Sequence, residues 1–565
     1  MSSASEALWV AAPRPAAAGA LEEAGHPSWL AGVLARRGVA DARGAGAFLE
    51  PRLPAHGAPA ALAQLPAAVE RLAAGRARGE SVAVVADYDV DGITAAAQLL
   101  AVLRACAMTA VSILPERLRE GYGFQPEHAV RAADSGCGLI ITADCGSGAH
   151  AAVAAARERG LDVIITDHHL GHGPAPGGAL EVNPRRCGAS DAAADLCGAG
   201  LAFKLASAFG ERCGRPVSPT RLLRLACLGT IADMVPLTRE NRVIAALGLE
   251  ALPATRSLGL QALLRHAGAA PPLTSEDVAF RIAPRLNAAG RMANAGRALE
   301  LLLTRDPSVA EELAAGLEEH NRDRRSAQEL VVEESTARFA ALRPLPGILV
   351  EWSADWHRGV VGIAAGRIAR DFHRPTLLFS VAGELAVGSG RSLPGIHLFE
   401  FLEPWGDALV RFGGHAQAVG LSAASERLPA LRAAWQAAAA GWPAELLLPT
   451  LEYEASLPPD ALDEELLARL QRLEPFGIGN PEPRLRVGPL RLLGSPRPFG
   501  RGHLSAAAFS ASGRPLSLVG WGWGERAAEL AGEFEALGCW RFDRYREGPV
   551  FQLEAARPWR PAAPA

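Results

Sequence analysis

Lysine is almost absent from this chain of 565 residues: Lys204 is the single lysine among 57 basic residues, and the others are all arginine. The formal net charge is −4, which excludes a protein coated with positive charge. Any contacts with a polyanion must therefore be local, because the overall field does not attract one. Arginine binds phosphate well through its planar guanidinium, so the shortage of lysine does not argue against a phosphate site.

Cysteine pairs and long apolar runs are lacking as well. The eight cysteines form no CxxC pair and no regular spacing, which argues against a zinc or disulfide framework. No apolar stretch is long enough to span a bilayer, and Met1–Pro15 does not have the basic-then-apolar pattern of a signal segment. We therefore expect a cytoplasmic protein with reduced cysteines and no membrane partner.

A Val-rich apolar run within Ser81–Thr94, SVAVVADYDVDGIT, leads directly into three acidic residues at alternate positions, Asp87, Asp89 and Asp91. Such an unbroken apolar run is typical of a strand buried on both faces of a parallel sheet, and these sheets bind ligands at the carboxyl ends of their strands. Three ionised carboxylates so close together require a cation. We interpret this stretch as half of a site for a hard metal ion.

The same spacing also begins the calcium-binding loop of helix-loop-helix proteins. That loop needs a preceding helix and a glutamate at its twelfth position. Here a strand is predicted before the acidic residues, and the twelfth position is Gln98. A calcium loop or a purely structural role is therefore disfavoured.

Two further apolar segments end in acidic residues. Gly138–Asp144 precedes CGSG, and Leu161–Asp167 precedes His168 and His169. Segments of helical length separate them, which is the βαβ pattern of a parallel sheet. A single aspartate at a strand end is commonly a helix N-cap, but three such ends with a His-His pair favour a site. Asp233 follows a predicted helix that ends before a proline, and we expect it opposite the other acids.

Four motifs, taken in order, resemble those of the DHH phosphoesterase superfamily. They are DYDVDG at 87–92, TADCGSG at 142–148, the triplet Asp167-His168-His169, and GTIADMVPL at 229–237. Further stretches at 115–123, 182–184, 196–205 and 280–291 resemble one branch of it, the bacterial single-strand-specific 5′→3′ DNA exonucleases. The resemblance covers about residues 48 to 555. It implies hydrolysis of single-stranded DNA to 5′-mononucleotides, in DNA repair and recombination.

The resemblance and the chemistry of the donors together predict the site. Oxygen ligands suit Mg²⁺ or Mn²⁺, and an imidazole favours Mn²⁺; two ions are expected. The expected metal ligands are Asp87, Asp89, Asp91, Asp144, His168 and Asp233, and the expected catalytic residues are Asp144, His168 and His169. The expected substrate-binding residues are Arg117, Arg285, Asn287, Arg291, Ser389, Arg391, Ser392 and His415.

From Pro307 the sequence predicts one helix to about residue 342, with Asp306 as its N-cap. At 1.5 Å per residue it would span roughly 50 Å, enough for a strut between domains. Beyond it lies a second α/β segment with GSGRS at 388–392 and GGHA at 413–416. Glycines there let backbone N–H groups approach an anion, and the resemblance implies the DHH-associated substrate-binding domain.

Short predicted strands separated by turns occupy the last segment and are typical of a small OB-like barrel. Trp521 and Trp523 lie two apart in a predicted strand, Leu516–Trp523, so we expect them on one face. There they either stack bases or pack in the core.

The predicted fold is α/β, with a DHH-type parallel-sheet domain joined by a long helix to a second α/β domain, plus a C-terminal OB-like barrel. The expected divisions are an extension (1–50), the DHH catalytic domain (51–270), a linker with the long helix (271–342), the DHH-associated domain (343–445) and the barrel (446–565).

Two classes of alternative remain open. One is an enzyme of small substrates, either a phosphodiesterase of short oligonucleotides or cyclic dinucleotides or a related pyrophosphatase. The other is a catalytically inactive DNA-binding scaffold. Single-stranded DNA is the expected partner, a single-strand-binding protein and a helicase are candidate protein partners, and a monomer is expected.

Overall fold

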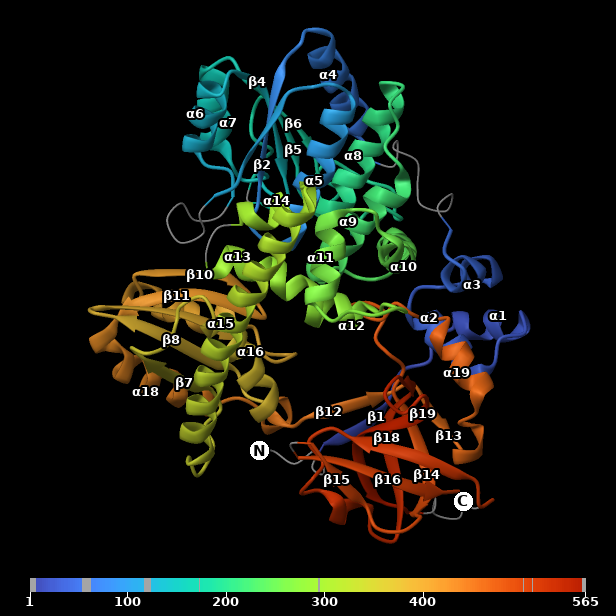
Figure 1. Cartoon of the computed structure of the whole chain (residues 1–565). Helices are drawn as coiled ribbons and strands as arrows, with labels where there is room; N and C mark the ends of the chain where they lie inside the picture. Colours follow the sequence, from blue (N-terminus) through green and yellow to red (C-terminus); the bar gives the residue numbers. More distant parts are fainter. Residues whose placement is uncertain are drawn as a thin grey trace. The chain divides into compact units, whose positions relative to one another are not determined.

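The computed structural model describes residues 7–52, 62–115, 123–171, 173–292, 295–500, 502–510 and 512–560. The chain divides into two compact units (Figure 1). The N-terminal unit comprises Pro15–Asn321 together with Gln471–Glu482. The C-terminal unit comprises Met1–Arg14, Arg322–Leu470 and Pro483–Ala565.

A five-stranded parallel sheet forms the centre of the N-terminal unit, in the order β3-β2-β4-β5-β6. Apolar residues on both of its faces are buried, as the unbroken Val and Ile runs predict. The strands are β2 (Ser81–Ala86), β3 (Ala110–Ile113), β4 (Cys137–Ala143), β5 (Asp162–Thr166) and β6 (Ala179–Val182).

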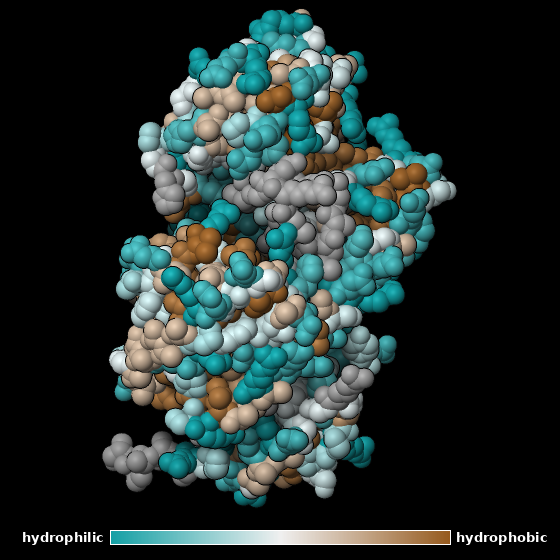
Figure 2. Space-filling model, turned by 90° about the vertical axis from the view of Figure 1, so that its left-hand side faces the viewer, coloured by the Kyte–Doolittle hydropathy of each residue, from teal (hydrophilic) through white to brown (hydrophobic). Residues whose placement is uncertain are grey.

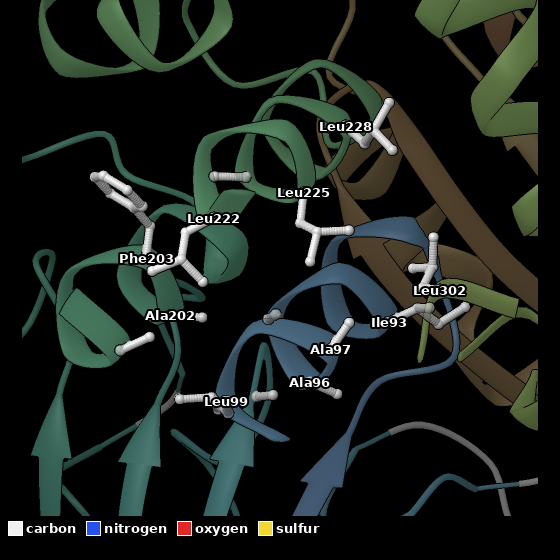
Figure 3. Close-up of a cluster of buried hydrophobic side chains, with 14 of the residues drawn as sticks. Ile93, Ala96, Ala97, Leu99, Ala202, Phe203, Leu222, Leu225, Leu228 and Leu302 are labelled. Carbon is white, nitrogen blue, oxygen red and sulfur yellow. The ribbon is translucent and has the colours of Figure 1, made fainter. Parts of the chain in front are cut away.

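Helices cover both faces of this sheet (Figure 1). On one face lie α4 (Leu65–Ala77), α5 (Val90–Ala105), α8 (Gly198–Arg212) and α9 (Pro219–Ala232), and on the other lie α6 (Pro126–Asp134) and α7 (His150–Glu158). Leu99 of α5, Phe203 of α8 and Leu225 of α9 belong to the largest core cluster (Figure 3). This packing fixes the start of α5, where Asp89 and Asp91 lie, and the end of α9, where Asp233 lies. It also fixes the start of α8.

The unit contains further helices. They are α1 (Ala17–Glu23), α2 (Ser28–Arg36), α3 (Ala42–Leu49), α10 (Arg239–Ala251), α11 (Leu258–His266), α12 (Ser275–Asp277), the π-helical turn η5 (Val278–Ile282), α13 (Ala283–Met292) and α14 (Gly296–Leu303).

The predicted long helix is confirmed as α15, Pro307–Ala340. Asp306 caps it, because its Oδ1 accepts hydrogen bonds from the backbone N–H groups of Ser308 (2.7 Å) and Val309 (3.1 Å). The helix runs from the last residues of the N-terminal unit into the C-terminal unit.

The C-terminal unit begins with a mixed sheet in the order β10-β11-β9-β8-β7. Its strands are β7 (Leu349–Ser353), β8 (Thr376–Ala382), β9 (Leu385–Arg391), β10 (Arg411–His415) and β11 (Ala418–Ala424). Helix α16 (Val361–Phe372) and the end of α15 pack on one face, and α17 (Leu398–Leu402) and α18 (Leu428–Ala439) pack on the other.

The last part of the unit is a closed β-barrel, which confirms the predicted barrel. Its order is β13-β14-β18-β19-β17-β16-β15, and an additional pairing of β14 with β16 closes the ring. The strands are β13 (Ala455–Leu457), β14 (Leu485–Leu492), β15 (Arg497–Phe499), β16 (His503–Phe509), β17 (Pro515–Gly520), β18 (Glu533–Asp543) and β19 (Gly548–Pro558), and helix α19 (Glu464–Gln471) lies between β13 and β14 in the sequence. Near the N-terminus β1 (Leu8–Ala11) pairs in parallel with β12 (Thr450–Tyr453).

The expectation of one tryptophan face is wrong. Strand β17 ends at Gly520, and Gly522, at φ 74°, turns the chain between the two tryptophans. Trp523 is 1% exposed and packs in the barrel core, whereas Trp521 is 51% exposed. Trp521 instead contacts the rings of Phe499 and His503, with centroid distances of 5.6 and 4.8 Å.

Gln471–Glu482 belongs to the N-terminal unit although the chain on either side of it belongs to the C-terminal unit. The buried Arg242 guanidinium donates to the carbonyls of Leu473 (2.8 Å), Arg472 (3.1 Å) and Glu474 (2.8 Å). Ile478 accepts a 2.7 Å hydrogen bond from the N–H of Leu237.

Among the described residues no single helix is long and apolar enough to cross a membrane, although one sharply bent pair, Arg239–Ala254 with Leu258–His266, passes the same test by length and composition. On the face shown in Figure 2, hydrophobic residues form small separate patches among hydrophilic ones.

Candidate metal centre

Hydrogen bonds between side-chain oxygens and backbone N–H groups fix the acidic loop between β2 and α5. Asp89 caps α5, since its Oδ1 accepts from the N–H of Gly92 at 3.1 Å, and Asp87 Oδ1 accepts from the N–H of Tyr88 at 2.8 Å. Gly92 has to be glycine, because a Cβ there would lie 2.5 Å from the carbonyl oxygen of Asp87. From α13, Asn287 Oδ1 accepts from the N–H of Val90 at 3.1 Å.

Asp91 joins two helices at the centre of the unit. It lies in the first turn of α5 and is buried, and its two carboxylate oxygens accept from the N–H groups of Gly198 (2.7 Å) and Ala199 (2.8 Å) at the start of α8. The positive end of the α8 dipole therefore stabilises the ionised carboxylate.

Asp144 follows β4 with a left-handed backbone, φ 65°, which is costly for a residue with a Cβ. Its side chain is buried against α8, where a Cβ on Gly198 would lie 2.5 Å from the Cβ of Asp144. The absence of a side chain at Gly198 thus leaves the space that the Asp144 carboxylate occupies.

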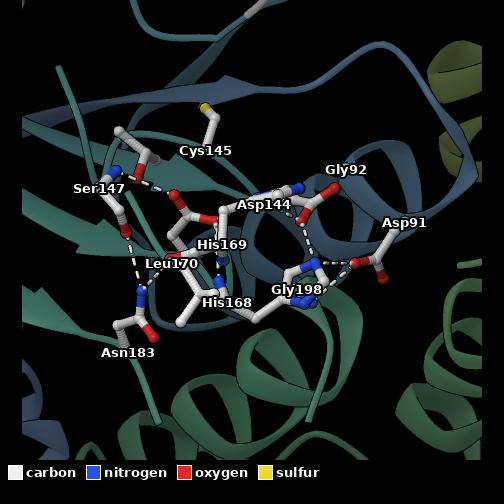
Figure 4. A network of polar contacts seen from close by, with 12 residues as sticks. Asp91, Gly92, Asp144, Cys145, Ser147, His168, His169, Leu170, Asn183 and Gly198 are labelled. Atoms are coloured by element: carbon white, nitrogen blue, oxygen red, sulfur yellow. Dashed lines mark hydrogen bonds and ion pairs between the residues drawn. The ribbon is translucent and has the colours of Figure 1, made fainter. Parts of the chain in front are cut away.

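His168 brings the acids together (Figure 4). Its Nε2 lies 3.0 Å from Asp144 Oδ1, 3.5 Å from Asp233 Oδ2 and 3.8 Å from Asp91 Oδ2. Despite the 3.0 Å separation, neither His168 Nε2 nor Asp144 Oδ1 has a hydrogen-bond partner, and His168 Nδ1 has none either. Two buried side-chain atoms that lie this close without a hydrogen bond are an arrangement that a shared cation stabilises.

Three overlapping groups of donors meet the spacing for a metal ion: Asp87 with Asp89 and Asp144, Asp91 with His168 and Asp233, and Asp144 with His168 and His169. All six residues predicted as ligands therefore lie together, and Asp144 belongs to two of the groups. The carboxylate oxygens and imidazole nitrogens fit Mn²⁺ or Mg²⁺. Burial raises the pKa of the neighbouring Cys145 thiol well above its usual value.

His169 lies beside the group and is oriented by Asp167. Its Nδ1 is 2.7 Å from Asp167 Oδ1, and Asp167 also accepts from the N–H groups of Ser147 (2.9 Å) and His168 (2.7 Å). Burial lowers the pKa of His169, but the hydrogen bond and charge of Asp167 outweigh this effect and raise it to about 9. Burial raises the pKa of Asp167, but its hydrogen bonds with His169 and the backbone outweigh this and lower it.

Burial disfavours the ionised form of two of these acids when no cation is present. Burial, followed by the charges of Asp91 and Asp89, raises the pKa of Asp144 well above its usual value, and the same causes raise that of Asp233 to about 8. Burial also lowers the pKa of His168. A cation entering the centre must therefore displace protons from the carboxyls.

Four of the residues predicted to bind substrate belong to the N-terminal unit, and the structure describes the side chains of two of them. Arg117 and the side chain of Arg291 lie outside the described residues. Arg285 is buried and pairs with Glu318 Oε2 at 2.5 Å, so its guanidinium is engaged within the unit. Asn287 fastens the acidic loop, as described above.

In the C-terminal unit, Ser389 and Arg391 lie on β9 against the first turn of α16. A Cβ on Gly362 of α16 would lie 3.2 Å from Ser389 Oγ and 3.4 Å from Arg391 Nη2, so a glycine lets the helix start approach both side chains. Ser392 Oγ donates to the carbonyl of Ile396 at 2.7 Å. His415 ends β10 and is exposed.

Sequence reasoning assigned no role to Asn183 and Arg185, although the stretch 182–184 was one of the family-like stretches. The Asn183 amide donates to Ser147 Oγ (2.8 Å) and to the carbonyl of His169 (2.9 Å), so it fastens the loop that carries the histidines. The exposed Arg185 lies close enough that its charge lowers the pKa of both His168 and Asp233.

Comparison with known families confirms the resemblance. The model described as "DHH family, N-terminal domain" matches residues 81–230, "DHHA1 domain" matches 345–441, and "RecJ OB domain" matches 453–556.

Curated relatives carry the name single-stranded-DNA-specific exonuclease RecJ. The Salmonella typhimurium protein is 35% identical over 87% of this chain and 88% of its own length. The Bacillus subtilis protein is 35% identical over 81% of this chain, but the match covers 58% of that longer protein. The Thermus thermophilus protein is 36% identical over 86% of this chain and 69% of its own.

Solved structures agree. The crystal structure of RecJ from Thermus thermophilus in complex with Mn²⁺ superposes with a TM-score of 0.82 at 30% identity, over 98% of this chain and 80% of that one. A structure of exonuclease RecJ bound to manganese has a TM-score of 0.60 at 36% identity, over 68% of this chain and 96% of that one.

Proposed function

The chain belongs to the RecJ family of single-stranded-DNA-specific exonucleases, and we propose that it degrades single-stranded DNA from the 5′ end to 5′-mononucleotides at the cluster around Asp144 and His168. The observation that carries this proposal is the pair of unpartnered buried atoms, His168 Nε2 and Asp144 Oδ1, 3.0 Å apart within six candidate ligands. The enzyme is a metal-dependent hydrolase that uses Mn²⁺ or Mg²⁺.

Asp87 and Asp89 lie with Asp144 in one group of donors, and Asp91, His168 and Asp233 form another. The two groups would each hold one ion, and the resemblance to the family assigns Asp144, 3.0 Å from His168 Nε2, as the ligand that would be shared. When bound, two such ions supply Lewis-acid catalysis, activating a water molecule and neutralising charge on the leaving oxygen. The six side chains would hold the two ions at one place in the N-terminal unit.

His169 binds the scissile phosphate. Because Asp167 engages its Nδ1, the ring donates to the phosphate through its Nε2–H, and the side chain is 46% exposed. In the metal-free chain burial lowers the pKa of His169, but Asp167 outweighs this effect and raises it to about 9, which favours an imidazole that donates to an anionic oxygen. Arg185, whose charge acts on the same centre, adds a second cation for the phosphate.

The direction of degradation comes from a clamp on the 5′-terminal phosphate. Ser389 and Arg391, beside the start of α16, are its side chains in the C-terminal unit. Arg117 and Arg291 complete it by resemblance to the family. Such a clamp would select the 5′ end of the strand, which is consistent with release of one nucleotide at each cut.

The barrel supplies a further contact for the single strand. Trp521, half exposed and in contact with Phe499 and His503, forms a platform for bases, and Arg546 lies 5.4 Å from the centre of the Phe499 ring. Aromatic stacking beside a cation binds single strands without reading their sequence.

The division into an extension, a DHH domain, a linker, a DHH-associated domain and a barrel at the predicted boundaries is part of the same proposal. The enzyme acts as a monomer in the cytoplasm, where chromosomal DNA is repaired and recombined, and a single-strand-binding protein and a helicase supply its substrate. The complete acidic set argues against an inactive scaffold, and the barrel argues against a phosphodiesterase restricted to dinucleotides.

The deciding experiment uses single-stranded DNA of about 40 nucleotides, labelled separately at each end, with Mn²⁺ and then with chelator. Metal-dependent release of a labelled 5′-mononucleotide, with gradual shortening of the 3′-labelled strand, is the expected result. Asp144→Ala is the inactive control. Hydrolysis of dinucleotides without cleavage of the long strand would contradict the proposal.

A further inference from the structure

Two large apolar side chains stand exposed directly beside the metal centre. Leu170, which follows His169, is 64% exposed, and Met234, which follows Asp233, is 67% exposed. Because His168 Nε2 and Asp233 Oδ2 lie 3.5 Å apart, these two residues flank the same cluster of charges. Single apolar residues on a surface need no explanation, but a pair next to a highly polar centre points to a ligand with an apolar part.

The backbone at Leu170 is fixed on both sides, which presents its side chain rigidly. The Asn183 amide donates to the carbonyl of His169 at 2.9 Å, and Arg186 Nη1 donates to the carbonyl of Leu170 at 2.7 Å. Arg186 is itself held by the buried Glu181, 3.0 Å from its Nε. Figure 4 shows Leu170 beside the two histidines.

Met234 is presented by a left-handed backbone, with φ 59°. A residue with a Cβ adopts this conformation only where its surroundings impose it. The chain on both sides of it is anchored, because Ile231 in the last turn of α9 and Val235, the residue after Met234, are both buried. The chain thus turns outward at one residue, and that residue carries a flexible, polarisable side chain suited to flat apolar surfaces.

We propose that Leu170 and Met234 bind the base and deoxyribose of the nucleotide whose phosphate lies at the metal centre. This inference rests on the proposed function. Apolar contacts with a base face carry no hydrogen-bond pattern, so the pair accepts all four bases. Rigid presentation lowers the entropic cost of the contact, and it would favour nucleotides over an unsubstituted sugar-phosphate.

The test compares two 5′-phosphorylated single strands, one with a normal first nucleotide and one whose first nucleotide is an abasic tetrahydrofuran, by the kcat/KM for release of the first unit. Wild type should prefer the base-bearing strand by roughly tenfold, the scale of one stacking contact. In the double variant Leu170→Ser with Met234→Ser, cleavage of the base-bearing strand should fall until the ratio approaches one. Cleavage of the abasic strand should change little.

Two further variants keep the result interpretable. Leu170→Met with Met234→Leu retains apolar surface and should keep the preference. Leu385→Ser removes an exposed leucine from β9 of the C-terminal unit and should leave the ratio at the wild-type value. Circular dichroism melts verify that every variant is folded.

An unchanged preference for the base-bearing strand in the double serine variant would overturn the inference. If that variant also shifts in oligomeric state on size-exclusion chromatography, the pair is instead an interface between copies. If wild type cleaves neither strand with Mn²⁺, the proposed function itself fails, and the two failures are thereby distinguished.

Discussion

His168 Nε2 and Asp144 Oδ1 lie 3.0 Å apart in the buried centre of the N-terminal unit, with no hydrogen bond between them. A cation is the species that relieves the contact of two electron-rich atoms. Asp144→Ala should therefore remove cleavage and weaken Mn²⁺ binding while leaving affinity for single-stranded DNA largely intact. Nuclease assays, calorimetry and filter binding measure the three quantities.

The matched control is Asp162→Ala. Asp162 is the first residue of β5, at the end of the strand away from the metal centre, and its exposed carboxylate pairs with Arg71. This variant should leave cleavage and Mn²⁺ binding unchanged. Wild-type cleavage rates in Asp144→Ala would refute the site.

Asp167 acts through His169, so replacing it should lower kcat and leave the ions in place. Asp167→Asn keeps the shape but removes the charge that orients and protonates the imidazole, and loss of such a partner typically costs about 10- to 100-fold. We expect the loss in kcat, with the Kd for DNA and the stoichiometry of Mn²⁺ unchanged. An equal loss of metal would instead make Asp167 part of the metal centre.

Affinity for Mn²⁺ should rise with pH. The pKa of Asp233 is about 8 in the metal-free chain and that of Asp144 is also raised, so binding at neutral pH releases protons. The affinity should increase up to about pH 8 and level off above it. Calorimetry in two buffers of different ionisation enthalpy measures both the affinity and the protons released, and a pH-independent affinity would contradict the assigned ligands.

The raised pKa of Asp233 should also make the folding stability of the metal-free protein fall as the pH rises. A carboxyl whose pKa is higher in the folded chain than in the unfolded chain stabilises the fold below its unfolded pKa, about 4, and this contribution is lost as the pH rises through about 8. With chelator present, Tm should fall between pH 6 and pH 8.5, and Asp233→Asn should show a smaller fall. An identical fall in both proteins would exclude Asp233 as its source.

The two tryptophans of the barrel should behave in opposite ways. Trp521→Ala should weaken binding of single-stranded DNA by roughly tenfold, the scale of one stacked base, with little change in Tm. Trp523→Ala should cost about 3–5 kcal/mol of folding stability, because it leaves a cavity in the core. Fluorescence anisotropy and urea unfolding of both variants provide the comparison, and equal effects on binding would refute the platform.

Arg391→Ala should slow cleavage of strands with a 5′-phosphate more than strands with a 5′-hydroxyl, because the guanidinium binds the terminal phosphate. Arg367→Ala removes an exposed arginine of the neighbouring helix α16, paired with Asp371, and should affect neither end. Equal losses on both ends in Arg391→Ala would remove the clamp.

Most of the fold follows from the sequence because its signals are local. The run Val82–Ala86 is apolar at every position, which only a strand covered on both faces tolerates, and Asp306-Pro307 marks the start of α15 by capping chemistry. The convergence of Asp87, Asp144 and Asp167 follows from the geometry of parallel strands, without knowledge of side-chain positions.

The remaining features depend on contacts between residues far apart in sequence. Asn287 is predicted to bind substrate, and its amide oxygen also accepts from the N–H of Val90, 197 positions away, a contact that no local pattern predicts. The tryptophan prediction failed because strand periodicity was extended through Gly522, whose positive φ ends it. Met234 is exposed between the buried Ile231 and Val235, and no pattern in the sequence predicts this.

The placement of Gln471–Glu482 has a consequence for synthesis. The N-terminal unit lacks this segment until the ribosome has made about 150 further residues beyond Asn321, which takes on the order of 10 to 30 s at bacterial rates. During that interval the Arg242 guanidinium has no Leu473, Arg472 or Glu474 carbonyl to receive its hydrogen bonds. The nascent chain therefore completes its nuclease unit only after the second α/β domain has emerged, so the enzyme matures late in translation.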